Sequence, residues 1–407
     1  PPRVSARQRG RTLWRDGCVK KRQPEGVCMR VRLVSARRVL KWATVAWVVV
    51  AALVSSHSSA GSATDEPTLW RTISVEGNPE NVIVNPDTEL LYTTHVTQDL
   101  NIFKAETGQV LATLHELGTG MALNRTTNTL YVAGWFYSTV SVVDLDTNTV
   151  VTKIPAAEQP LAIAVNPVTN RIYVNGNQPT VSVIDGRTNT VIEEIDHYAS
   201  DLAVDPVNNR LYVLTYEADT SSKLLSIDGD TSEVLGEVVV GREASAVAVD
   251  SAAGKVYVVS SVDGGTGTGQ LFIVDAHTFT VAAQVPTDQQ AYSVAVNTRT
   301  HLAYVGQFYD DSVAVFKPTG QRVATVSLGA GSSPQGVAVD EIHNLTYTAD
   351  ANASRISVIG AGPAPATPIP SKTATPAGIG RGGGPPGSAG DDKATALLAA
   401  GLALFAL

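Results

Sequence analysis

The sequence predicts an all-β fold, a seven-bladed β-propeller that an N-terminal strand closes by completing the last blade. Three observations predict it. One motif recurs seven times, each full copy contains four short strand patterns, and the last copy lacks its fourth strand. Four antiparallel strands repeated about every 42 residues are typical of propeller blades.

The first two strands of each copy are marked by an Asn or Asp and by a Tyr seven residues later. The apolar run before the Asn or Asp predicts strand a, and the Tyr lies in strand b. The Asn or Asp side chain can bond the backbone two residues on and start a turn. The seven pairs are Asn85/Tyr92, Asn124/Tyr131, Asn166/Tyr173, Asp205/Tyr212, Asp250/Tyr257, Asn297/Tyr304 and Asp340/Tyr347.

In the turn between strands a and b, we expect a left-handed backbone at the residue three positions before each Tyr. Five copies have an Asn or Gly there, which tolerates this backbone. These five are Asn128, Asn170, Asn209, Gly254 and Asn344. Glu89 and His301 depart from the pattern, so we expect some strain at both.

Strands c and d follow, as in "TVSVVD" and "TVVTKI" of the second copy. In four copies strand c ends in an Asp with a Thr three residues on: Asp144/Thr147, Asp185/Thr188, Asp228/Thr231 and Asp275/Thr278. Such side chains lock turns. The first and sixth copies have Lys104 and Lys317 instead, which favours a structural role over a catalytic one.

The last copy predicts how the ring closes. Its strand c, "RISVI" (355–359), runs into "GAGPAPATPIP" and has no strand d. The N-terminal "TLWRTISV" (68–75) resembles the other d strands. Pairing it with the last copy would remove exposed sheet edges. We therefore predict one propeller over 66–361.

The third copy carries a resemblance. "YVNGN" (173–177), with "VNPVTNRIYV" and "VSVIDGRTNTV", resembles the YVTN-family β-propeller repeat, and the resemblance extends over all seven copies. It implies an exported or surface-exposed propeller. It implies no single activity, because seven-bladed propellers include lactonases, lyases, dehydrogenase subunits and binding modules, and it carries over no catalytic residues.

The chain ends predict export. Residues 1–63 contain Met29 as the first plausible start, then a basic region, a 13-residue apolar run and small residues, which together predict a secretory signal peptide. An uncleaved anchor is the alternative, although a span needs roughly 20 residues. Residues 362–393 are Pro/Gly-rich and predict a disordered spacer, and the apolar segment 394–407 resembles a truncated membrane anchor. We expect an extracytoplasmic protein, secreted or attached to the cell surface or membrane.

Composition excludes several classes of function. Both cysteines, Cys18 and Cys28, precede Met29, so the mature chain has no disulfide, thiol chemistry or Cys-ligated metal. Residues 64–407 contain 17 basic and 36 acidic residues, a net charge of −19. This charge repels phosphates, so we expect no nucleic-acid partner. No cofactor is predicted.

The candidate binding face is the one that carries the b–c and d–a loops. The a–b and c–d turns share the opposite, uniform face. The distance from Tyr to the end of strand c varies from 12 residues in the third copy to 18 in the fifth. Variable loops on a rigid scaffold are the usual place for binding.

Aromatic and polar residues gather in these loops, in "GWFYS", "DHYASD", "GREAS" and "GQFYDD". Rings beside carboxylates suit sugar or peptide recognition. The alternative is that the rings pack between blades or cap the channel. The ligand-binding candidates are Trp135, Tyr137, His197, Tyr198, Arg242, Phe308, Tyr309 and Asp310.

The sequence favours a non-enzymatic binding module for an unknown sugar, peptide or protein. One alternative is a lactonase- or lyase-like enzyme at the channel mouth, and the other is a self-associating surface-layer component. Acid–base pairs for an enzyme would be His115 with Glu116, or His197 with Asp196 and Asp201. Asp228, Asp230 and Glu233 are close enough in sequence for Ca²⁺ but lack the full loop pattern, so we predict a turn there and no metal site.

Overall fold

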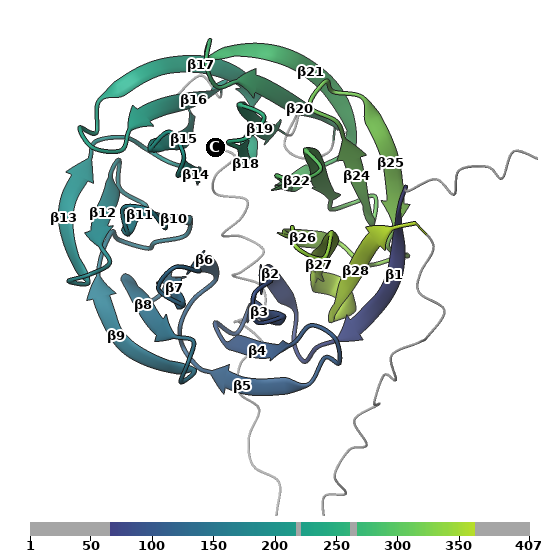
Figure 1. Cartoon of the computed structure of the whole chain (residues 1–407), viewed down its shortest axis with the longest axis horizontal. Coiled ribbons are helices and arrows are strands. Elements are labelled where there is room, and N and C mark those ends of the chain that lie inside the picture. Colours follow the sequence, from purple (N-terminus) through teal and green to yellow (C-terminus); the bar gives the residue numbers. More distant parts are fainter. Residues whose placement is uncertain (1–65, 217–220, 261–266, 363–407) are drawn as a thin grey trace, which may run out of the picture. The chain divides into compact units, whose positions relative to one another are not determined.

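The computed structural model describes residues 66–216, 221–260 and 267–362. Within these ranges, seven four-stranded antiparallel sheets form a ring (Figure 1). The predicted seven-bladed propeller is confirmed. The predicted signal peptide, most of the spacer and the apolar C-terminal segment lie outside the described residues. No helix among the described residues is long and apolar enough to cross a membrane.

Blades 1 to 4 contain β2 (Pro79–Asn85), β3 (Leu90–His95), β4 (Leu100–Lys104) and β5 (Val110–Leu114); β6 (Gly120–Asn124), β7 (Thr129–Gly134), β8 (Thr139–Asp144) and β9 (Thr149–Pro155); β10 (Ile163–Asn166), β11 (Arg171–Asn175), β12 (Val181–Asp185) and β13 (Thr190–Ile195); and β14 (Asp201–Asp205), β15 (Arg210–Tyr216), β16 (Ser221–Asp228) and β17 (Val234–Arg242).

Blades 5 to 7 contain β18 (Ala244–Asp250), β19 (Lys255–Ser260), β20 (Thr268–Asp275) and β21 (Thr280–Gln289); β22 (Ala291–Asn297), β23 (Leu302–Gln307), β24 (Ser312–Phe316) and β25 (Arg322–Ser327); and β26 (Pro334–Asp340), β27 (Leu345–Asp350), β28 (Arg355–Ala361) and β1 (Pro67–Ser74). A 3₁₀ turn, η1 (Ala351–Ala353), lies between β27 and β28.

The first strand of each blade lies toward the centre of the ring and the last lies at its rim (Figure 1). The seven inner strands β2, β6, β10, β14, β18, β22 and β26 each contact the next one around the ring. The residue five positions before the repeated Asn or Asp therefore stands at or just before the start of each inner strand, at the end where the b–c and d–a loops meet.

The N-terminal strand closes the ring as predicted. β1 pairs antiparallel with β28, from Pro67 opposite Ala361 to Ser74 opposite Arg355. Trp70 Nε1 and Thr68 Oγ1 both donate to the Gly362 carbonyl, at 3.2 and 2.6 Å. Gly360 makes room for the Trp70 ring, because a Cβ there would lie 2.3 Å from a ring atom.

The core consists of seven clusters, one at each interface between neighbouring blades. Each cluster contains the repeated Tyr of one blade together with apolar residues of the next. All seven of these Tyr residues are at most 4% exposed. The Tyr that marks the repeat is therefore the residue that joins one blade to the next.

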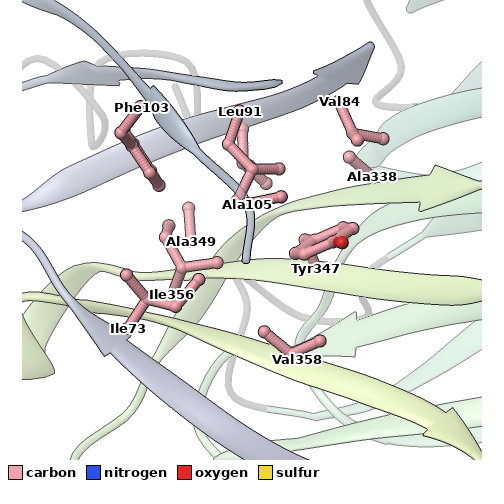
Figure 2. Packing of buried hydrophobic residues seen from close by; sticks show 11 residues of the cluster. Ile73, Val84, Leu91, Phe103, Ala105, Ala338, Tyr347, Ala349, Ile356 and Val358 are labelled. Carbon is pink, nitrogen blue, oxygen red and sulfur yellow. The ribbon is translucent and has the colours of Figure 1, made fainter. Parts of the chain in front are cut away.

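The cluster between blades 7 and 1 includes the closing strand (Figure 2). Ile73 of β1 is 5% exposed and packs with Ile356 of blade 7 and Phe103 of blade 1. Arg71 Nη2 donates to the Ala105 carbonyl of blade 1 at 2.6 Å. β1 therefore completes one blade and also holds the next.

The turn between strands a and b has the predicted backbone. All seven residues three positions before the Tyr have a positive φ, between 49° and 61°. Glu89 (55°) and His301 (59°) adopt it too, so both hold the strained geometry expected from the sequence.

Four of these left-handed residues also bond the preceding blade. Asn124 Nδ2 donates to Asn170 Oδ1 at 2.7 Å. Asn166 and Asn297 donate in the same way to Asn209 and Asn344, both at 2.9 Å. His301 takes the equivalent place opposite Asp250, with Nδ1 2.8 Å from Oδ2. The Asp250 carboxylate can only accept a hydrogen bond, and His301 of the next blade supplies the donor.

Glu89 would face the carboxylate of Asp340 across the closing interface, and His343 separates the two. Its Nδ1 lies 2.7 Å from Asp340 Oδ2 and its Nε2 lies 3.7 Å from Glu89 Oε1. Hydrogen bonding to Asp340, together with the negative charges of Asp340 and Glu89, raises the pKa of His343. When His343 is protonated, it links two carboxylates that would otherwise repel each other.

The Asp at the end of strand c locks the next turn, as predicted. Asp144 Oδ1 accepts from the backbone of Asp146 and Thr147, both at 2.9 Å. Asp275 makes the same bonds, and Lys255 Nζ lies 2.7 Å from it. That lysine is the main reason that the pKa of Asp275 lies well below its usual range.

Replacing Ile73 tests the closing cluster. We expect Ile73→Ala to lower the free energy of unfolding by about 2–5 kcal/mol, because it leaves a cavity between two blades. Thr72→Ala, at the exposed neighbour on the same strand, should change it by less than about 0.5 kcal/mol. Urea unfolding of the full chain measures both, and equal losses would contradict a closing role for Ile73.

His343 should make stability depend on pH. Its pKa is higher in the folded chain than in the unfolded chain, so its contribution is complete below about pH 6.5 and is lost as the pH rises through the folded value. The ring is 40% exposed, so we expect less than about 1 kcal/mol. Wild type should lose more stability than His343→Gln between pH 6 and pH 8.5 in urea unfolding. An equal loss in both proteins would exclude this role.

Candidate functional site

The eight predicted residues all lie at the b–c and d–a end of the ring, but on different blades. Trp135 and Tyr137 follow β7 of blade 2. His197 and Tyr198 join β13 to β14, and Arg242 ends β17. Phe308, Tyr309 and Asp310 follow β23 of blade 6. Of these eight, the structure brings Phe308 and Tyr309 into ring contact.

Blade 6 carries three rings in contact at this end. Phe308 meets Tyr309 edge-on, with centroids 5.2 Å apart and planes at 82°. On its other side Phe308 contacts Tyr292, with centroids 5.9 Å apart and planes at 42°. Tyr309 is 56% exposed. We call Tyr292, Phe308 and Tyr309 the Tyr292 cluster.

Glu80 accompanies this cluster. Tyr292, Gln335 and Glu80 are the second residues of the inner strands β22, β26 and β2, and these strands contact one another in that order. Burial raises the pKa of Tyr292 to about 12, and the charge of Glu80 adds to this increase. Burial also raises the pKa of Glu80. No hydrogen bond or ion pair holds the Glu80 carboxylate within the described part of the chain.

Sequence reasoning missed Tyr292 and Glu80 because it searched only the loops. A signal was present in the repeat. Both residues stand five positions before the repeated Asn. The other copies have Thr119, Leu161, Ser200, Ser245 and Gln335 at that position. Comparison at this register would have singled out one large aromatic residue and one acid.

In the aromatic loop of blade 2, a lysine of the chain already contacts one of the rings. Lys153 Nζ lies 5.2 Å from the centroid of the Tyr137 ring and donates to the Glu116 carbonyl at 3.1 Å. Trp135 is half-buried, whereas Phe136 is 62% exposed. This loop therefore presents one open ring, Phe136, beside a ring that faces its own lysine.

The two carboxylates of the blade 6 loop support backbone. Asp310 accepts from the Gln289 amide of blade 5. Asp311 accepts from Gly331 and Ser333 at 2.7 and 2.8 Å, which shapes the next d–a loop. The Asp310 carboxylate, predicted as a ligand group, therefore already serves as an acceptor within the fold.

The predicted acid–base pairs do not form as expected. His115 Nδ1 lies 3.0 Å from Asp99 Oδ1 rather than from Glu116, and both partners are solvent-accessible. His197 bonds neither Asp196 nor Asp201 within the residues that the structure describes. Asp201 Oδ2 instead accepts from the Val247 amide of blade 5 at 2.8 Å, and burial raises the pKa of Asp201 to about 7.

The acidic turn of blade 4 has an internal role. Asp228 accepts from the backbone of Asp230 and Thr231, at 2.9 and 3.1 Å, and pairs with Arg210. Among the described residues, no three His, Cys, Asp or Glu side chains are grouped closely enough to hold a metal ion.

A pocket of about 370 Å³ lies on the opposite face, between blades 4 and 5. Tyr212 and Phe279 stack in its wall with centroids 6.2 Å apart. Phe279 has a φ of 51°, in a turn position where other blades have Asn148 and Asn189. Sequence reasoning treated this face as uniform and did not predict the pocket.

The comparisons with known proteins support the fold alone. No protein-family model matches the chain, and no curated protein matches it in sequence. Among solved structures, hydrazine synthase from Kuenenia stuttgartiensis matches with a TM-score of 0.61 at 17% identity, over 71% of this chain and 97% of that one. The β-propeller domain of Cps50 (Swd1) from Myceliophteria thermophila matches with a TM-score of 0.59 at 15% identity, over 72% and 99%. The YVTN resemblance stays a prediction.

Proposed function

We propose that this propeller is a non-enzymatic binding module that recognises a ligand or partner through its b–c/d–a face. The observation that carries the proposal is the Tyr292 cluster, three touching rings with one of them 56% exposed, at the inner end of that face. Aromatic residues on a rigid frame supply large contact area at low cost in conformational entropy. The seven blade interfaces provide this frame.

We propose further that the repeats are of the YVTN type and that the chain is exported and displayed at the cell surface. The sequence supports this through the basic and apolar segments of residues 1–63, the spacer 362–393 and the apolar segment 394–407. Protease added to intact cells should digest the propeller. Complete protection, with digestion only after lysis, would contradict surface display.

Loop-face recognition can be tested by thermal melts of the full chain with a panel of cell-wall sugars, peptides and lactones. A ligand present at about 100 times its dissociation constant should add roughly 2.7 kcal/mol of stability. We expect Tyr309→Ala or Trp135→Ala to abolish this shift, because each removes contact area on the loop face. His197→Ala should leave it unchanged, since recognition by these rings needs no acid–base group at His197.

The same panel separates the proposal from its rivals. Turnover of a lactone that His197→Ala abolishes would replace the binding module with an enzyme. Self-association of the full chain without any ligand shift, unchanged by Tyr309→Ala, would favour a structural surface component. In both cases the proposed function would be wrong.

A further inference from the structure

We propose that the Tyr292 cluster and Glu80 together bind an organic ammonium cation, such as a trimethylammonium or alkylammonium group. The inference rests on the proposed function and deepens it by naming the chemical class of the ligand. Two observations support it. The three aromatic rings are set at different angles, and the Glu80 carboxylate, which has no partner among the described residues, stands at the same register of the inner strands as Tyr292.

The rings can attract a cation from more than one side. A cation is drawn to the face of an aromatic ring within about 6 Å of its centroid. Tyr292 and Tyr309 contact Phe308 at 42° and 82°, so the three faces point in different directions. A rounded, weakly hydrated ammonium group suits such a surface better than a flat sugar ring, which needs one broad face.

Glu80 supplies the charge. Glu80 is half-buried, and a carboxylate that is partly withdrawn from water loses hydration unless a partner replaces it. Other acids that the fold encloses have partners: Asp350 bonds Arg355 Nε at 3.0 Å, and Asp201 accepts the Val247 amide. Glu80 has none within the described residues. A bound cation would supply the missing partner, and an anionic ligand would be repelled.

In blade 2, a contact between a cation and an aromatic ring forms within the chain. There Lys153 lies over the Tyr137 ring at 5.2 Å. No Lys or Arg of the described residues lies over a ring of the Tyr292 cluster in this way. The cluster therefore has the aromatic surface and the negative charge, but its cation must come from outside the described part of the chain.

The test compares a cation with its neutral isostere. We would titrate the full chain with choline and with 3,3-dimethylbutan-1-ol by calorimetry at matched ionic strength. The two probes have the same shape, so the alcohol measures apolar contact alone. We expect choline to bind at least about tenfold more tightly than the alcohol.

Variants identify the residues. Glu80→Gln keeps the shape of the side chain and removes its charge, and should weaken choline binding at least about tenfold. Tyr309→Ala should weaken it severalfold, whereas Tyr309→Phe should retain it. Leu161→Ala is the matched control, because Leu161 occupies the same register in blade 3 and is 42% exposed. It should leave binding unchanged, and melts of each variant confirm that the fold is intact.

Each outcome decides the matter. Absence of choline binding, equal binding of choline and the alcohol, or unchanged choline binding in Glu80→Gln would overturn the inference. The proposed function would survive any of these results if a sugar or peptide still bound and lost its binding in Tyr309→Ala. It would fail separately if no ligand responded to the loop-face variants.

Discussion

The interface between neighbouring blades is the interaction on which the rest of this structure depends. Each repeated Tyr is buried among residues of the following blade, so a blade taken alone would leave its largest core residue in water. Burial of one such side chain contributes a few kcal/mol only when the next blade is present. The fold is therefore stable as a closed ring, and β1 is needed because it places Ile73 and Arg71 on the last interface.

Polar contacts at the a–b turns make the same connection between blades. At three interfaces two Asn amides bond each other, as in Asn124 and Asn170. Where the first position is Asp, the partner changes: His301 answers Asp250, and His343 stands between Asp340 and Glu89. The departures from the repeat at Glu89 and His301 are thus matched across an interface, which explains why their strained backbone is tolerated.

The same rigid frame leaves the loop face free to vary. The residues five positions before the repeated Asn or Asp stand at one register of the inner strands, and among the seven Tyr292 is the one aromatic ring and Glu80 the one charged group. Glu80 has no partner among the described residues, and its charge helps to raise the pKa of Tyr292. Places where a local rule is broken without a structural benefit are where function is expected, and this argument links the frame to the proposed ligand.

The sequence by itself determined the number of blades, the strand order, the left-handed turn residues and the closing strand, because each follows from spacing along the chain. It also determined which face carries the variable loops. Only the tertiary structure decided that Tyr292 joins Phe308, that the charge of Glu80 affects Tyr292, that Asp310 supports backbone and that His115 meets Asp99. The ring contact, the effect of Glu80 on Tyr292 and the Asp310 bond join different strands or blades. Such contacts depend on where closure of the ring places each side chain, and no local pattern in the sequence contains that information.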